Sequence, residues 1–473
     1  MKKIFTLQEA EDLSLGTVKD LYNKFVNPYQ TKILSNFPFG SDSFSKAEGM
    51  YVYTKDNKKI LDFTGGLGVL NHGHNHPRIL KARKEYAEKS KMEVHKLVFS
   101  NYLAALSSNL AAVIGNDLEK VFLCNSGAEA VEGAIKLSSR FNKNKKYILS
   151  SNKSYHGKLI GSGSISGSYQ GRKNFPKMEN VKFFDFNKLS SLENELREAE
   201  KDGGVYAVIF EPFSATLLQS CSEEFIRGLK ELKKKYNFVI ICDEVYCAWY
   251  KCGYFFYFQK FENFKPDILL LSKSLGGGKS SISALISNSK IYEKVYGSVE
   301  NANLHTTTYN GFGEECATAI EAINIMIEDN YEEKVKIIEK SLTSELNEIL
   351  KKNKSKIKKF QGSGSLWGIE FNSFIDGISS IIEKIPNETL EKKNTLIAKL
   401  CSASICSELY SKFKILTFVS ESKNSNYLYI APSLIVDQDQ IKHFFSSLDK
   451  VINSNINLNL ANYLVRSVLN LIR

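Results

Sequence analysis

The 473-residue chain lacks the cysteine patterns of a metal-binding or disulfide-rich protein. Its eight cysteines form no Cys-x-x-Cys pair, and none stands at zinc-finger spacing from a histidine. Cys242 falls inside a continuous apolar run, as a buried thiol would. We therefore expect reduced cysteines in a reducing compartment, and a cytoplasmic protein.

Long apolar runs are missing as well. No stretch of about 18 uncharged apolar residues occurs, so we expect no membrane span. The basic start Met1–Phe5 resembles the beginning of a signal peptide. Gln8, Glu9, Glu11 and Asp12 break the apolar segment that would have to follow, so we reject that interpretation.

Repeats and low-complexity tracts are also absent, and 43% hydrophobic with 24% charged residues is ordinary for a soluble globular enzyme. The length allows two or three packed regions. The net charge of +11 is densest at residues 351–359, where no aromatic residues interleave with the lysines. A nucleic-acid site would need such a pattern or a known motif, so we interpret this run as a solvated surface.

Three alternating histidines, His72, His74 and His76, have the spacing of side chains on one face of a strand. Gly73 and Pro77 interrupt strand geometry at this point. We therefore expect no metal site here.

The middle of the chain alternates strand-like and helix-like segments. The strand-like runs are residues 121–124, 146–149, 205–210, 238–242 and 268–271, with helical patterns following Ser126 as far as Arg140 and at Glu223–Tyr236. This alternation predicts an α/β fold with a mostly parallel sheet covered by helices on both faces. Ligands of such sheets bind at the carboxyl ends of the strands.

The two ends of the chain differ from the middle. Residues 50–60 read as a hairpin with an Asp-Asn turn. Further elements are expected as helices at 331–353, 393–411 and 437–453, a glycine-containing apolar segment at 362–371 and a strand at 427–430. Residues 1–60 and 331–473 are therefore predicted to build a smaller α+β domain beside a large domain at 61–330. Residues 464–472 have amphipathic helical spacing and are expected to pack on their own protein.

Lys273 follows the apolar run Ile268–Leu271, and two residues separate it from the glycines Gly276–Gly278. Asp243 ends the buried run before it. A lysine and an acid at the carboxyl ends of two central strands suggest a pyridoxal-phosphate site. The lysine would bind the aldehyde, and the acid would keep the ring nitrogen protonated.

Three further motifs are weak when taken singly. Asn125-Ser-Gly-Ala-Glu129 joins a strand to a helix and offers backbone N–H groups to a phosphate. Ser154-Tyr-His-Gly157 places an aromatic ring before a histidine, and His305-Thr-Thr-Thr-Tyr309 clusters hydroxyl groups. Taken in order with Asp243 and Lys273, they resemble the class III (omega-type) aminotransferases of fold type I pyridoxal-phosphate enzymes. The resemblance runs from about residue 61 to 320 and is greatest to the putrescine and ornithine aminotransferase branches.

The resemblance implies a role for each matching residue. Lys273 resembles the Schiff-base lysine that also shuttles the proton, and Asp243 resembles the partner of the pyridinium nitrogen. The remaining cofactor contacts it implies are Ser126, Gly127 and Ala128 at the phosphate, Val245 and Tyr155 on the two ring faces, His156 and Tyr246 beside the ring, and Thr308 from a neighbouring subunit. A homodimer with composite sites is implied, and no metal.

The chain departs from the family pattern around the substrate. Tyr246 stands where the family has a glutamine on the cofactor's phenolic oxygen. After Glu211, the family's Gln-Gly-Glu, whose glutamate gates a substrate-binding arginine, becomes Ser214-Ala-Thr216. Tyr429 aligns with that arginine, which would clamp a carboxylate bidentately. We expect Glu211 and Tyr429 to lie at the substrate, and small α-amino acids to be disfavoured.

Three functions remain open at this point. The first is an aminotransferase that moves an amino group between a primary amine, of ω-amino or diamine type, and a carbonyl acceptor. The second is an aminomutase, epimerase or decarboxylase on the same scaffold, and the third is a non-catalytic cofactor-binding protein. Lys158, Arg172 or Lys251 would restore a carboxylate clamp from another direction.

Overall fold

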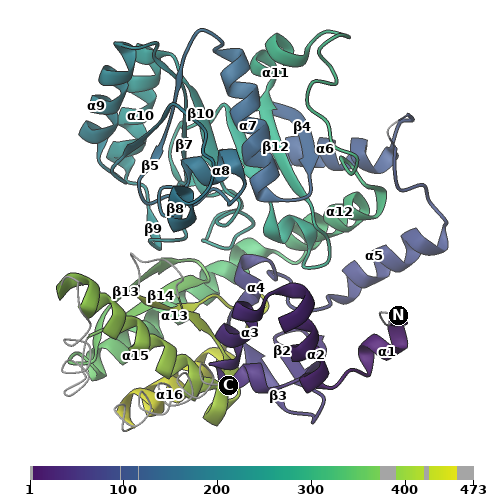
Figure 1. The fold of residues 1–473 in the computed structure, drawn as a ribbon, viewed down its shortest axis with the longest axis vertical. Helices are drawn as coiled ribbons and strands as arrows, with labels where there is room; N and C mark the ends of the chain where they lie inside the picture. The colour runs from purple at the N-terminus through teal and green to yellow at the C-terminus, as the bar shows by residue number, and fades with distance from the viewer. Residues whose placement is uncertain (1–3, 96, 116, 373–389, 420–425, 455–473) are drawn as a thin grey trace.

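The central element of the computed structural model, which describes residues 4–95, 97–115, 117–372, 390–419 and 426–454, is a seven-stranded sheet (Figure 1). Its strand order is β4-β12-β11-β10-β7-β5-β6, and β12 alone among them runs antiparallel to its neighbours. The strands are β4 (Leu118–Cys124), β5 (Tyr147–Ser151), β6 (Val181–Phe184), β7 (Val205–Phe210), β10 (Val239–Asp243), β11 (Ile268–Leu271) and β12 (Ser283–Asn288). The expected mostly parallel sheet is confirmed.

Helices cover both faces of this sheet because its strands are apolar on both sides. Ile209, Ile241 and Leu270 pack with α7 (Gly127–Phe141) and α11 (Ser289–Tyr296) on one face. Val208 and Leu269, whose side chains point the other way, join the opposite core. The helices on that second face are α6 (Asn101–Ile114), α9 (Leu189–Glu200), α10 (Glu223–Tyr236) and α12 (Gly313–Glu328).

Helix α10 shows how the sequence sets the bounds of an element. Ser222 caps its first turn by accepting a hydrogen bond from the Phe225 backbone N–H at 3.1 Å. Two glutamates occupy the first turn and three lysines the last, as the helix dipole favours. Asn237 then ends the helix in the left-handed conformation.

Two smaller four-stranded sheets lie below the central one in Figure 1, where the purple N-terminal elements adjoin the yellow-green C-terminal ones. The first joins β1 (Phe44–Glu48), β2 (Tyr51–Thr54) and β3 (Lys59–Asp62) to β15 (Ile415–Leu416), which pairs in parallel with β3. The second contains β13 (Ile357–Ser363), β14 (Leu366–Phe371), β17 (Tyr427–Ile430) and β16 (Phe418–Val419). Both chain ends therefore share a sheet, although the domain boundaries at residues 60 and 330 stay a prediction.

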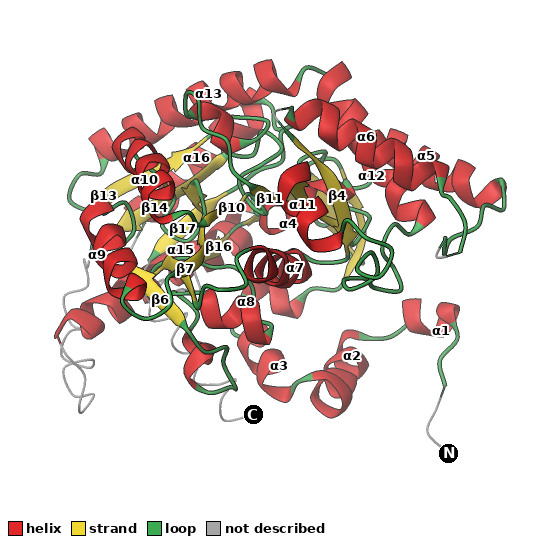
Figure 2. Cartoon of the chain, turned by 90° about the horizontal axis from the view of Figure 1, so that it is seen from above, coloured by secondary structure: helices red, strands yellow, loops and turns green. Residues whose placement is uncertain are grey.

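The remaining elements are shorter or peripheral. Helices α1, α2 and α3 bury no residue and extend along one edge of the molecule (Figure 2). The bounds are α1 (Leu7–Glu11), α2 (Leu15–Leu21), α3 (Pro28–Ser35), α4 (Gly65–Gly68), α5 (Pro77–Glu88), α8 (Ile160–Ile165), α13 (Tyr331–Lys352), α15 (Leu390–Phe413), α16 (Gln438–Asn453), the hairpin β8 (Phe213–Ser214) and β9 (Gln219–Ser220), the π-helical turn η1 (Tyr22–Val26), and the 3-10 turns η2 (Pro38–Ser41), η3 (Gln170–Lys173), η4 (Tyr257–Lys260) and η5 (Lys273–Gly276).

The elements predicted from the sequence are found within a few residues of their expected bounds, and the helix at Glu223–Tyr236 and the strands at Val205–Phe210, Ile268–Leu271 and Tyr427–Ile430 match. The 362–371 segment divides between β13 and β14. Residues 464–472 lie outside the described residues. Within the described part of the chain, no helix is both long and apolar enough to span a membrane.

Candidate active site

Three adjacent strands deliver three polar side chains to one edge of the central sheet. Glu211 follows β7, Asp243 ends β10, and Lys273 comes two residues after β11. The strands are parallel neighbours, with Cys242 opposite Phe210 and Asp243 opposite Leu270. Their carboxyl ends therefore meet where ligands of such sheets bind.

Lys273 is held at this edge by an unusual backbone turn. Its φ of 51° lies in the left-handed region, which a residue with a side chain adopts at a cost of about 1–2 kcal/mol. The neighbouring strand end is fixed by a hydrogen bond of 2.6 Å between the hydroxyls of Ser283 and Ser272. Burial lowers the pKa of the Lys273 amine, and the charge of Asp243 partly opposes that shift. The outcome is an amine that releases its proton more readily than a surface lysine.

Asp243 is fixed through both carboxylate oxygens. Oδ2 lies 2.6 Å from Nδ1 of His156, and Oδ1 accepts a hydrogen bond of 3.0 Å from the Val245 backbone N–H. Both Asp243 and His156 are buried. The carboxylate is therefore held in one orientation, as pairing with a ring nitrogen requires. The sequence resemblance implies a place for His156 beside the cofactor, but it gives no sign of this pair.

Glu211 is buried next to the same pair. Burial is the main reason that the pKa of its carboxyl is raised to about 7, with His156 lowering it and Asp243 raising it. Its Oε2 accepts a hydrogen bond of 3.1 Å from the backbone N–H of Tyr155, a residue that is 43% exposed. Glu211 thus orders the segment that carries Tyr155 and His156.

The start of helix α7 is built as the phosphate prediction requires. Ser126 is the N-cap residue, and Gly127 and Ala128 are the first two helical residues, whose backbone N–H groups have no acceptor within a helix. A Cβ on Gly127 would lie 2.9 Å from both methyl groups of Val245. Glycine is therefore required here, because Val245 packs directly against the helix start.

The turn after Asp243 places bulky residues on a backbone of the kind that glycine usually adopts. Trp249 and Tyr250 both have φ of 63°. The Trp249 indole donates a hydrogen bond of 3.1 Å to the Ser272 carbonyl, and its own carbonyl accepts one of 2.7 Å from Asn71. These contacts and the burial of the indole offset the backbone strain. They also tie the turn to the strand end that carries Lys273.

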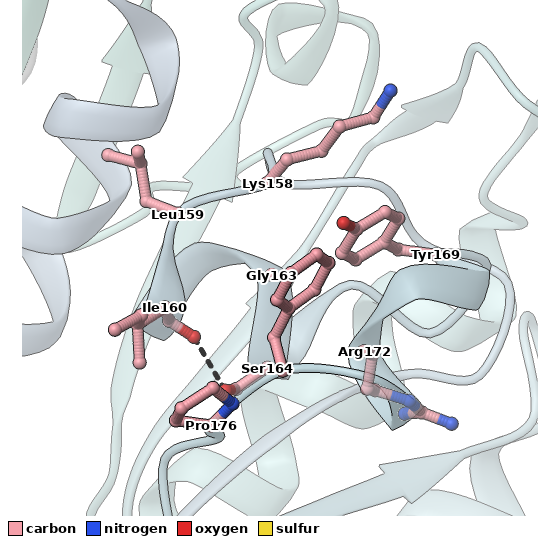
Figure 3. Close-up of a pocket in the computed structure, with 9 residues that line it drawn as sticks. Lys158, Leu159, Ile160, Gly163, Ser164, Tyr169, Arg172 and Pro176 are labelled. Atoms are coloured by element: carbon pink, nitrogen blue, oxygen red, sulfur yellow. Dashed lines mark hydrogen bonds between the residues drawn. The ribbon is translucent and has the colours of Figure 1, made fainter. Parts of the chain in front are cut away.

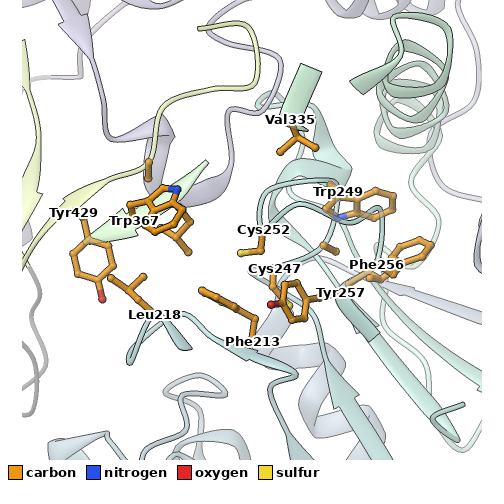
Figure 4. Close-up of a cluster of buried hydrophobic side chains, with 14 of the residues drawn as sticks. Phe213, Leu218, Cys247, Trp249, Cys252, Phe256, Tyr257, Val335, Trp367 and Tyr429 are labelled. Carbon is orange, nitrogen blue, oxygen red and sulfur yellow. The ribbon is translucent and has the colours of Figure 1, made fainter. Parts of the chain in front are cut away.

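An aromatic cluster stands where the family pattern has its arginine and gating glutamate (Figure 4). Tyr429 of β17 donates a hydrogen bond of 3.0 Å to the Ala215 carbonyl and stacks on Phe418 at 4.7 Å between ring centroids. Phe213 packs on Tyr257 at 5.2 Å. The Tyr429 hydroxyl thereby joins the small C-terminal sheet to the β8–β9 hairpin without a charged side chain at that position.

Lys251 does not supply a substitute clamp. Its side chain is fully buried, and its ammonium donates hydrogen bonds of 2.9 and 2.8 Å to the carbonyls of Ala431 and Pro432. Burial lowers the pKa of this amine to about 8. Its hydrogen bonds bind the turn after β10 to the segment after β17, which is a structural role.

A separate cavity of about 370 Å³ opens beside the segment that follows His156 (Figure 3). Two cations line it, Lys158 and Arg172, together with apolar and aromatic side chains. The Arg172 guanidinium lies 4.3 Å from the centre of the Phe183 ring, while its buried Nη1 has no hydrogen-bond partner among the described residues. A positive lining with an unpaired donor suits an anionic group.

The remaining positions singled out in the sequence are Thr308 and the alternating histidines. Thr308 is exposed and lies in the segment between α11 and α12, so its predicted contact with a second subunit stays a prediction. His74 pairs with Asp62 at 2.8 Å, and His72 lies 3.0 Å from the Tyr331 hydroxyl. Among the described residues, no group of three histidine, cysteine or acidic side chains is arranged to hold a metal ion.

Comparison with known proteins agrees with this geometry. The family profile described as Aminotransferase class-III matches residues 40–452. The acetylornithine aminotransferase of Clostridium acetobutylicum is 31% identical over 367 residues, which is 75% of this chain and 88% of that protein. The chain belongs to the class III aminotransferases. It is therefore a pyridoxal-phosphate-dependent transaminase, as the sequence predicted.

Solved structures of the family show the same fold. The ornithine aminotransferase of Toxoplasma gondii superposes with a TM-score of 0.78 at 21% identity, covering 95% of this chain and 98% of that one. The taurine:2-oxoglutarate aminotransferase of Bifidobacterium kashiwanohense, solved with pyridoxal phosphate and glutamate, gives 0.78 at 22% identity, covering 93% and 98%. The fold type I architecture is confirmed.

The residues of this site fit pyridoxal phosphate. A half-buried amine, an oriented carboxylate and an open helix start lie around one strand edge. The Tyr246 Oη and His156 Nε2 atoms are buried there with no partner in the described part of the chain. Orphaned polar atoms of this kind are costly unless a ligand pairs with them.

Glu211 generates a pH-dependent prediction for the cofactor-free protein. Because its pKa is raised from 4.5 to about 7, the folded state holds a proton that the unfolded state releases, and stability falls as the pH rises through 7. Glu211→Gln should lack this loss. Relative to wild type, the variant should gain roughly 2–3 kcal/mol of unfolding free energy between pH 5 and pH 8. Denaturant titrations at both pH values measure the difference, and a pH-independent gap contradicts it.

Proposed function

We propose that this enzyme transfers the terminal amino group of a substrate whose anionic group lies several bonds away from that amine. The main observation behind this proposal is the position of Tyr429. Its hydroxyl is committed to the Ala215 carbonyl, so the position that would clamp an α-carboxylate presents an aromatic ring. A small α-amino acid would bury its carboxylate there without a cationic partner, which is costly.

The cavity lined by Lys158 and Arg172 supports the second part of the proposal. It adjoins the segment carrying Tyr155 and His156, so a substrate lying between Lys273 and this cavity would place its amine and its anion at opposite ends. A diamine would bring a second cation toward Lys158 and Arg172, which is unfavourable. An amino group remote from a carboxylate therefore fits better than a terminal diamine. The acetylornithine aminotransferase relative carries a substrate of this kind in its name.

The side chains divide the chemistry among them. When bound, pyridoxal phosphate supplies the electron sink that makes amino transfer feasible. Lys273 would hold the cofactor and, as a free amine of lowered pKa, move the proton at the substrate carbon. Asp243 would keep a positive charge on the ring nitrogen, and His156 orients that carboxylate. The backbone N–H groups of Gly127 and Ala128 would bind the phosphate.

A donor comparison tests the substrate class. We expect N-acetylornithine and 4-aminobutyrate to exceed both glutamate and 1,4-diaminobutane as amine donors by about tenfold or more in kcat/KM, because one lost charge pair costs at least that much. Lys158→Ala should raise KM for the two acids and leave the diamine unaffected or improved. Lys340→Ala, a lysine change on α13, serves as the matched control. Glutamate or the diamine ranking first would contradict the proposal.

We further propose that the enzyme works as a homodimer with composite sites. Leu97, Phe99 and Val299 expose nearly their whole side chains, and an apolar surface of this kind needs cover. Glu93 joins this region to α12, since its carbonyl and carboxylate accept hydrogen bonds from the backbone N–H groups of Gly313 and Glu314. Thr308 precedes α12 in the same region. A cytoplasmic location remains a prediction from the reduced cysteines.

Mixing two inactive chains tests the composite site. If Thr308 serves the neighbouring subunit, a hybrid of Lys273→Ala with Thr308→Asp contains one intact site, made from Lys273 of one chain and Thr308 of the other. Random reassociation should restore about a quarter of wild-type activity, since half the dimers are hybrids and each has one intact site. If Thr308 serves its own subunit, mixing restores nothing. Reassociated homodimers of each variant are the controls.

A further inference from the structure

Tyr246 is the site residue that departs most from the family pattern, and its surroundings are specific. It lies in the turn after Asp243 and packs against the core. Its hydroxyl is buried and has no hydrogen-bond partner within the described residues. Burial raises the pKa of this phenol well above its ordinary value, with smaller effects from Tyr429 and Cys252, so it stays protonated as a hydrogen-bond donor.

The Tyr246 ring lies against the Lys273 side chain. Nζ of Lys273 is 4.8 Å from the ring centroid, a distance at which an ammonium is attracted to the face of an aromatic ring. Asp243, whose charge favours the ammonium, is the acidic group that acts on Lys273 from β10. Tyr246 therefore provides a second, uncharged stabilisation of the same cation from the turn that follows.

Gly68 makes this contact possible. Its φ is 89°, and a Cβ there would lie 3.0 Å from Cε1 and Cζ of Tyr246 and 3.4 Å from Cδ of Lys273. The Gly68 carbonyl accepts a hydrogen bond of 2.9 Å from the hydroxyl of Ser274, the residue after Lys273. The glycine-rich turn at 65–68 is thereby fastened to the lysine turn, and it leaves just enough room for the ring. The turn itself contributes no charge to the contact.

We propose that Tyr246 is a positioning residue for Lys273: its ring holds the amine when the lysine is free, and its hydroxyl gains its hydrogen-bond partner only when the cofactor is bound. The inference rests on the role proposed above for Lys273 and is independent of the substrate. The partner is an acceptor oxygen on the cofactor, since a protonated phenol inside the site donates. Where the family pattern has a glutamine that hydrogen-bonds only, this chain uses an aromatic ring with a donor at its end.

The ring's part is tested on the full-length, cofactor-free protein. Competitive labelling with acetic anhydride across pH, followed by peptide mass spectrometry, gives the pKa of Lys273. Tyr246→Phe keeps the ring and should leave the midpoint where it is. Tyr246→Leu and Tyr246→Gln should lower the midpoint by about 0.5–1.5 pH units, because the ammonium loses the ring face. Tyr246→Gln is the less disruptive change, so it provides the measurement if Tyr246→Leu does not fold. Equal midpoints in wild type, Tyr246→Phe and Tyr246→Gln overturn this part.

The hydroxyl's part is tested by comparing cofactor-free and cofactor-loaded protein. Tyr246→Phe removes a buried donor that has no partner, so the cofactor-free variant should melt at the same temperature as wild type or higher. Its Kd for pyridoxal phosphate should rise about fivefold, and the absorbance band of the bound cofactor should titrate at a shifted pH. A lower melting temperature without cofactor, or an unchanged Kd, overturns this part. Neither result depends on which amine is the substrate, so failure here is distinct from failure of the donor comparison.

Discussion

The site depends on keeping an amine and a carboxylate together at the buried edge of a parallel sheet. Lys273 has a lowered pKa because it is buried, while Asp243 is buried and held by His156 and the Val245 N–H. Burying such groups is unfavourable unless each is paired. Many nearby features follow from this constraint, including the left-handed backbone at Lys273 and the Trp249 hydrogen bond to the strand end.

The same constraint explains why the chain departs from the family pattern on the substrate side of the site and matches it on the cofactor side. The α7 start, Asp243, Val245 and Lys273 match the family pattern, and in the proposed site all four would contact one rigid ligand. The substrate side has no such template. There the Tyr429 hydroxyl donates a hydrogen bond to a carbonyl of the β8–β9 hairpin, and the Lys251 ammonium donates to two other backbone carbonyls. Hydrogen bonds to backbone carbonyls therefore connect the small C-terminal sheet to the hairpin and to the turn after β10. The family pattern has a substrate-binding arginine and its gating glutamate on this side.

The central strands and the cofactor side were predictable because their signals are local. Ile268–Leu271 is a short apolar run that stops at a lysine and glycines, and Ser126 stands between a strand and a helix. Strand β12 was not foreseen, because Ser283–Asn288 begins and ends with polar residues and its antiparallel pairing depends on β4, far away in sequence. The sequence resemblance assigned His156 to the cofactor, but its bond to Asp243 spans 87 residues and leaves no local pattern.

The close approach of Gly68 to Tyr246 and the raised pKa of Glu211 could not be predicted from the sequence, for a related reason. The glycine run at 65–68 reads as an ordinary turn until the Tyr246 ring is seen against it. The Glu211 shift comes from burial under neighbours that the chain supplies from several elements. Spacing predicts which residues reach the strand edge, whereas protonation and orientation depend on what packs around them.

Mapping of the cofactor-linked lysine tests the central claim most directly. Purified enzyme loaded with pyridoxal phosphate is reduced with borohydride, digested, and analysed for the modified peptide. We expect a single stoichiometric modification on Lys273, which disappears in Lys273→Ala. The same modification on Lys251, Lys279 or any other lysine would contradict the assignment of the site.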